Sequence, residues 1–129
     1  MSTSNITRGM TVSQEMIVTH KDTAAAHGSG KLEVFATPAM VCLMENTAIK
    51  CLKGALGDQE DSVGVAINVK HVKATAVGKK VGCRATVEEV EGRRVRFAVE
   101  AWDEEAGIGS GTHERAIINP EKFMAKIER

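Results

Sequence analysis

Hydrophobic residues along this chain follow two different periods, which divide it into one helix and a set of strands. From residue 38 to residue 49 the chain is apolar on nearly every side, and its one charged residue is Glu45. A Thr-Pro pair at 37–38 precedes this run. Threonine can cap free backbone N–H groups and proline fits the first helical position. The pattern predicts a buried helix from Thr37 to about Leu56, with Gly57 as its left-handed cap.

After residue 61 the apolar residues recur at every second position, which is typical of half-buried β-strands. In the first of these strands Val63, Val65, Ile67 and Val69 share one face. Further strands are expected at 81–87, 95–101 and 112–118, with turns at 77–80 and 91–92 and a glycine-rich loop at 103–111. A strand within 10–19, a mobile small-residue linker at 20–31 and a partly helical tail at 121–127 complete the pattern.

This order of elements predicts an α+β fold with one long central helix wrapped by an antiparallel β-sheet. Short turns favour antiparallel neighbours, because parallel strands need long crossovers. That architecture is the hotdog fold. We expect a single domain over residues 1–129, with residues 1–9 as a flexible lead-in. The sheet would keep open edges, so we expect a homodimer, with a higher oligomer left open.

Composition excludes several classes of function. The 17 basic and 17 acidic residues cancel, and the chain has only three Phe and one Trp, so we expect no nucleic-acid partner. No apolar run reaches the length of about 20 residues that crosses a bilayer, and no signal peptide is visible, so we expect no membrane partner. Cys42, Cys51 and Cys83 lack metal or disulfide spacing and suggest small core residues of a reduced, cytoplasmic protein. The four histidines also lack ligand spacing, so no metal site is expected.

Three residues are candidates for chemistry. A lone acid on a buried helix, such as Glu45, is either paired with a cation or kept for a reaction. His71 shares the parity of the inward-facing valines, which directs its imidazole toward the helix that carries Glu45. A core histidine with satisfied nitrogens is the competing interpretation of His71. For Thr37, a helix cap alone would explain the residue.

These residues also carry a resemblance to a known family. The segment 34–41, VFATPAMV, with Glu45 eight residues after Thr37 and His71 thirty-four after it, resembles the fluoroacetyl-CoA thioesterase-like group of hotdog proteins. The segments 62–65 and 111–115 are similar to recurring segments of that group, and the resemblance covers roughly residues 10–120.

The resemblance implies hydrolysis of an acyl-CoA thioester to a carboxylic acid and free CoA, with Thr37, Glu45 and His71 as the catalytic residues. It also makes Gly64, His113 and Arg115 candidates for substrate binding, the last two as weak candidates for contact with a phosphate. No cofactor is expected, since CoA enters as part of the substrate. A general base or nucleophile, a proton shuttle and donors for the oxyanion are what this reaction needs.

Helix geometry adds a constraint, since eight residues of helix rise about 12 Å. Thr37 and Glu45 of one chain therefore cannot hydrogen-bond directly. Either the substrate spans the gap, or the site combines residues of two subunits at a dimer interface. Residues 24–31 contain no aromatic side chain, so no aromatic lid that would select a small halogenated acyl group is evident.

Two other functions are compatible with the same fold. A non-catalytic hotdog module that binds an acyl-CoA is the main alternative. A hotdog hydratase is the weaker one, because the Asp/His spacing it would need is not found in this chain.

Overall fold

The computed structural model describes residues 5–128, so the first four residues of the predicted lead-in lie outside the described part. Within it, Ile6 is buried and the backbone N–H of Gly9 donates to the carbonyl of Val87 at 2.8 Å. The elements in chain order are β1 (Thr11–Ile17), η2 (His20–Asp22), α1 (Ala24–His27), α2 (Thr37–Leu52), β2 (Asp61–His71), β3 (Lys80–Glu91), β4 (Arg94–Asp103), β5 (Gly107–Ile118) and α3 (Pro120–Ile127).

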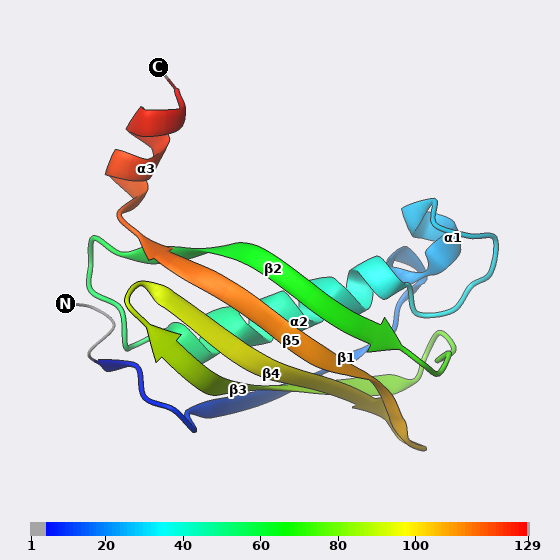
Figure 1. Cartoon of the computed structure of the whole chain (residues 1–129). Coiled ribbons are helices and arrows are strands. Elements are labelled where there is room, and N and C mark those ends of the chain that lie inside the picture. The colour runs from blue at the N-terminus through cyan, green and yellow to red at the C-terminus, as the bar shows by residue number, and fades with distance from the viewer. Residues whose placement is uncertain (1–4, 129) are drawn as a thin grey trace.

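The strands form one five-stranded sheet in the order β1-β3-β4-β5-β2, and every neighbouring pair is antiparallel. The long helix α2 crosses one face of this sheet (Figure 1). This arrangement confirms the predicted α+β architecture. Within the described residues, no helix has the length and apolar character needed to cross a membrane.

The core lies between α2 and the sheet. Met40 and Met44 of α2 are fully buried, as are Phe97 of β4 and Ile108 of β5. Gly109 of β5 lets the helix approach closely, because a Cβ atom there would lie 2.6 Å from the Sδ atom of Met40. The first half of α2 is thereby held close to the sheet, which fixes where its half-buried side chains point.

Strand β2 contains a bulge that alters the predicted alternation. The register with β5 shifts between Gly64 and Ala66. Val63 consequently pairs with Ala116 on the face away from α2, and Val65 lies in the bulge, 43% exposed. The prediction that these two valines face the core was therefore wrong, because the bulge changes the parity of the strand. After the bulge the predicted parity is correct. His71 pairs with Gly109 of β5, and its side chain lies on the face of the sheet that α2 covers.

Three other segments differ from the prediction. Helix α2 ends at Leu52 rather than near Leu56, and the chain turns at Gly54, whose φ of 97° suits glycine, so Gly57 is not the cap. The expected linker at 20–31 contains the helical turns η2 and α1. The glycine-rich segment at 103–111 is mostly strand, because β5 already begins at Gly107.

The outer face of the sheet is a solvated, ion-paired surface. Arg84 pairs with Glu100 at 2.7 Å, Arg94 with Glu114 at 3.2 Å, and Arg96 with Glu88 and Glu89 at 3.3 Å. Cys51 and Cys83 are buried as expected, whereas Cys42 is exposed, because it lies on the side of α2 that faces away from the sheet.

Strand β2 is one edge of the sheet (Figure 1). Besides Val65, its Ile67 is exposed, at 39%, although it lies on the same face as the buried His113 with which it pairs. An edge strand with exposed β-branched residues is a surface on which another strand can pair.

Candidate active site

The structure brings Thr37 and His71 together. Thr37 is the first residue of α2, and His71 is the last residue of β2. The Oγ1 atom of Thr37 and the Nδ1 atom of His71 are 2.8 Å apart, within hydrogen-bond distance. The prediction that the imidazole points toward the helix is therefore confirmed, and it meets the start of the helix rather than Glu45.

The hydroxyl of Thr37 does not cap the helix. The N-cap residue is Ala36, and no side chain caps this end. Pro38 occupies an early helical position, where a missing N–H costs nothing. The interpretation of Thr37 as a cap was therefore wrong, because the helix begins one residue earlier than a capping threonine would require. Its hydroxyl is available to His71.

The environment of His71 favours the neutral imidazole. Burial lowers its pKa below the usual value of 6.5, and the backbone of Lys73 opposes that shift in part. The Phe35 ring meets the imidazole edge-on, with ring centroids 6.3 Å apart. Among the described residues, the buried Nε2 atom of His71 has no hydrogen-bond partner. A buried polar atom without a partner is a place where a substrate or another chain can bind.

Glu45 lies in a second group of residues, farther along α2. It is half-buried and faces Gly64 of β2. A Cβ atom at Gly64 would lie 3.0 Å from Oε2 of Glu45, 3.3 Å from Cε1 of His113 and 3.4 Å from Nη1 of Arg115. The absence of a side chain at Gly64 therefore leaves room for the carboxylate beside two nitrogen-bearing side chains.

His113 and Arg115 form a buried network on β5. The Nε atom of Arg115 donates to Oγ of Ser62 at 2.8 Å, and its Nη2 atom donates to the Ser62 carbonyl at 3.1 Å. Its Nη1 atom lies 3.1 Å from Nε2 of His113, whose Nδ1 atom lies 2.8 Å from the carbonyl oxygen of Ala66. Because a guanidinium only donates and a carbonyl only accepts, His113 must carry its proton on Nδ1 and accept at Nε2.

Electrostatics agree with this assignment. Burial lowers the pKa of His113 below 6.5, and the charge of Arg115 lowers it further, so the imidazole is neutral. Burial also lowers the pKa of Arg115, and the nearby charge of Glu45 opposes that effect. Arg115 is thus a fixed positive charge close to the Glu45 carboxylate. This places His113 and Arg115 beside Glu45, and their assignment as substrate-binding residues stays a prediction.

The predicted residues therefore form two groups in the single chain. Thr37 and His71 lie at one end of α2, and Glu45 lies with Gly64 and Arg115 about 12 Å farther along the helix axis. The sequence analysis missed Ser62, although its position two residues before Gly64 gives it the same parity and hence the same face of β2.

A cavity of about 400 Å³ adjoins the Thr37–His71 pair. Its walls include Phe35, Pro38, Lys73 and, from the segment around α1, Ala24 and Ser29. Cavities of 300–1,000 Å³ are typical of small-molecule sites. A larger cavity of about 780 Å³, between residues 57–60 and α3, contains none of the predicted site residues. Within residues 5–128, no cluster of three or more His, Cys, Asp or Glu side chains could hold a metal ion.

Comparison with known proteins identifies the family. The profile of the fluoroacetyl-CoA-specific thioesterases matches residues 18–121. A fluoroacetyl-CoA thioesterase from Streptantibioticus cattleyicolor is 47% identical over 97 residues, which cover 75% of this chain and 70% of the relative.

Solved structures agree. The fluoroacetyl-CoA thioesterase FlK superposes with a TM-score of 0.89 at 38% identity, covering 95% of this chain and 96% of the other. A variant of FlK was solved in complex with fluoroacetate and CoA; it has a TM-score of 0.87 at 38% identity and covers 92% and 99% of the two chains.

A more distant structure supports the fold alone. A hot-dog-like protein from Thermanaerovibrio acidaminovorans superposes with a TM-score of 0.89 at 24% identity, covering 97% of this chain and 93% of that one. The predicted hotdog fold is thereby confirmed. The chain belongs to the fluoroacetyl-CoA-specific thioesterase family, and it is a hotdog-fold thioester hydrolase.

Proposed function

We propose that this protein is a homodimeric acyl-CoA thioesterase whose two active sites each combine Thr37 and His71 of one subunit with Glu45 of its partner. The observation that carries the proposal is the placement of the two groups toward opposite ends of one edge strand. Gly64, beside Glu45, lies near the start of β2, and His71 is its last residue. Relatives that act on fluoroacetyl-CoA support the acyl-CoA class of substrate.

Two-fold symmetry would join the groups. Two β2 strands that pair in antiparallel fashion about a two-fold axis bring the Gly64 end of one strand beside the His71 end of the other. Val65 and Ile67, which are exposed in the single chain, would be covered by the same contact. The unpartnered Nε2 atom of His71 would then face the neighbouring subunit or a substrate bound between the two.

The reaction uses water and needs no cofactor. The water oxygen attacks the thioester carbonyl carbon while Glu45 accepts the water proton, or Glu45 attacks first and water then hydrolyses the resulting anhydride. In both routes the C–S bond breaks, CoA leaves as a thiolate and takes up a proton, and the acyl group leaves as a carboxylic acid. Free backbone N–H groups at the start of α2 can stabilise the oxyanion, because this end has no side-chain cap.

The roles of the two paired residues follow from their contact. His71, neutral at pH 7 because burial lowers its pKa, can hydrogen-bond through Nε2 to the reacting carbonyl or to Glu45. Thr37 fixes the ring through Nδ1. The reducing cytoplasm is the expected compartment, since all three cysteines are free thiols.

Thiol release from a panel of short, branched and aryl acyl-CoAs tests the activity. Turnover with none of them, together with tight binding of an acyl-CoA, would favour the non-catalytic hotdog module instead. Light scattering at micromolar concentration tests the dimer.

A subunit-mixing experiment tests the shared site. Glu45→Gln and His71→Ala subunits are each expected to be inactive as homodimers. After unfolding and refolding together, half of the dimers are mixed, and each mixed dimer has one intact site, so about a quarter of wild-type activity should return. A site built within one chain would give no recovery.

A further inference from the structure

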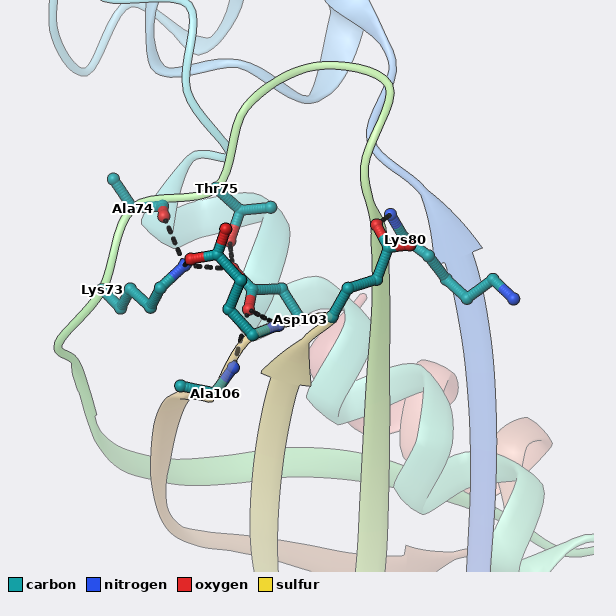
Figure 2. A network of polar contacts seen from close by, with 8 residues as sticks. Lys73, Ala74, Thr75, Lys80, Asp103 and Ala106 are labelled. Carbon is teal, nitrogen blue, oxygen red and sulfur yellow. Dashed lines mark hydrogen bonds and ion pairs between the residues drawn. The ribbon is translucent and has the colours of Figure 1, made fainter.

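Asp103, the last residue of β4, is a nearly buried carboxylate whose two oxygens bind different segments of the chain. Its Oδ1 atom accepts hydrogen bonds from the backbone N–H groups of Glu105 and Ala106, at 2.8 and 3.0 Å. Its Oδ2 atom accepts from Nζ of Lys73 at 2.5 Å and from Oγ1 of Thr75 at 2.9 Å (Figure 2). The carboxylate therefore joins the β4–β5 turn to the segment that follows β2.

This network is more elaborate than a β-turn requires. The two backbone bonds to Oδ1 would suffice to close the turn. A second pair of donors on Oδ2 adds the charge of Lys73, which also lies 3.3 Å from Glu105. A buried carboxylate is expensive unless its oxygens are satisfied, and here both are. The part that the turn does not need is the link to Lys73 and Thr75.

Each of those two residues leads to one member of the Thr37–His71 pair. Lys73 follows His71 by two residues along the chain. The carbonyl of Thr75 accepts a hydrogen bond from the backbone N–H of Phe35 at 2.8 Å, and Phe35 precedes Thr37 by two residues. The ring of Phe35 also contacts the ring of His71.

The contacts thus form a closed circuit. It runs from Asp103 through Lys73 to His71, across the hydrogen bond to Thr37, and back through Phe35 and Thr75 to Asp103. A circuit of this kind constrains the distance between Thr37 and His71, because each is connected to the carboxylate through a different donor, Thr75 on one side and Lys73 on the other.

We propose that Asp103 is a positioning residue, which holds the Thr37 hydroxyl and the His71 imidazole in the geometry that thioester hydrolysis requires. The proposal rests on the proposed function of that pair. Displacement of a catalytic group by about 1 Å can lower a rate by about 100-fold, so a second layer of contacts has a large effect on turnover.

Asp103→Asn is the first test. An asparagine has one acceptor oxygen and one NH₂ group. One of the two donor pairs, either Lys73 and Thr75 or the N–H groups of the turn, would therefore face the NH₂ group and lose its acceptor. We expect kcat to fall by about 10- to 100-fold, with the KM for the acyl-CoA within about twofold, since no bond to substrate is removed.

Variants of Lys73 and Thr75, the two side-chain donors to Asp103, test the same proposal if Asp103→Asn does not fold. Lys73→Met and Thr75→Val should each lower kcat, because each opens the circuit on one side. Lys73→Arg preserves the positive charge and should retain most of the turnover. Loss of kcat in Lys73→Arg equal to that in Lys73→Met would contradict the proposal.

Two controls separate positioning from stability. Glu100→Gln removes the ion pair of 2.7 Å with Arg84 on the outer face of the sheet, the face away from Thr37 and His71, and should leave kcat unchanged. Val87→Ala opens a small cavity in the core of β3 and lowers the melting temperature. If Asp103→Asn loses no more kcat than Val87→Ala at a matched melting temperature, Asp103 is only structural.

A spectroscopic measurement tests the inference without turnover. The chain has four histidines, so the ring ¹⁵N–¹H signals of His71 can be assigned by their loss in His71→Gln. Asp103→Asn should shift these signals and Val87→Ala should not. An inactive wild-type protein would reject the proposed function, whereas unshifted His71 signals in Asp103→Asn would reject the positioning role.

Discussion

The Oγ1 atom of Thr37 lies 2.8 Å from the Nδ1 atom of His71, although the two residues are 34 positions apart in the chain. One comes from the first turn of the central helix and the other from the end of the edge strand. Because the helix start has no side-chain cap, this hydroxyl serves the imidazole and not the backbone. Chemistry, rather than helix stability, is therefore the property that should change when Thr37 is altered.

Thr37→Val tests that expectation. Valine has the shape of threonine without the hydroxyl, so His71 loses its partner, and kcat should fall by about 10- to 100-fold. The free energy of unfolding should change by less than about 0.5 kcal/mol, because the residue is exposed and caps nothing. Thr37→Ser keeps the hydroxyl and should stay active. Thiol-release kinetics and urea unfolding measure both quantities, and equal activity of the Val and Ser variants would remove Thr37 from the site.

Gly64→Ala should impair catalysis while the protein stays folded. The new Cβ atom would lie 3.0 Å from Oε2 of Glu45, which is the end of a flexible side chain, so the carboxylate would shift and the backbone would not. We expect kcat to fall by about tenfold or more. Gly107→Ala is the matched control, because a Cβ atom there meets nothing closer than 4.0 Å. The two variants should have similar melting temperatures, and similar kcat values would contradict the prediction.

Stability should decrease as the pH falls from about 7.5 to 5.5. Burial lowers the pKa values of His71 and His113 in the folded protein. Near pH 6.5 the unfolded chain therefore binds protons that the folded chain does not bind. Each group can contribute a slope of at most about 1.4 kcal/mol per pH unit, which ends once the pH passes the folded pKa. Asp103 stays ionised in this range, because Lys73 holds its pKa far below the usual value of 3.8.

Urea unfolding at pH 7.5, 6.5 and 5.5 measures this dependence. His113→Gln should reduce the slope, because it removes one of the two imidazoles whose pKa burial lowers. A stability that rises on acidification, or a slope that His113→Gln leaves unchanged, would contradict the assignment of a neutral His113.

Arg115→Lys should destabilise the fold although it keeps the charge. Lysine cannot reproduce the three separate hydrogen bonds to Ser62 and His113, so some buried acceptors lose their donors. The free energy of unfolding should fall by about 1–3 kcal/mol for each acceptor left unsatisfied. Arg94→Lys is the control, because Arg94 is exposed and its pair with Glu114 is solvated. Urea unfolding of both proteins tests the difference, and equal losses would show that the buried network adds nothing.

Much of this arrangement was predictable from sequence because it depends on periodicity. Alternation along the strands and the apolar run after Pro38 predicted the sheet and the central helix. The parity of His71 placed its ring on the helix face, which the structure confirms. The end of the helix was not predictable in the same way, because Ala55 and Leu56 continue the apolar pattern while the chain already turns at Gly54.

The contacts around Glu45 were harder to predict. Arginine is rarely buried, so the burial of Arg115 contradicts its average behaviour. A signal was nevertheless present, because His113 and Arg115 have the same parity as the buried Ile117. Asp103 gave no comparable signal, since its partners Lys73 and Thr75 come from a segment without regular structure. Pairing between subunits stays a prediction.

The bulge in β2 decides which residues of that strand share a face of the sheet. Gly64 and His71 are seven residues apart, an odd number, and an unbroken strand would turn them to opposite faces of the sheet. The extra residue at Val65 corrects the phase, so that both residues face α2. If the same residues formed a regular strand without the bulge, the glycine that makes room for Glu45 and the histidine bound to Thr37 would lie on opposite faces of the sheet. A bulge of one residue thus places the two functional ends of the edge strand on the same face of the sheet.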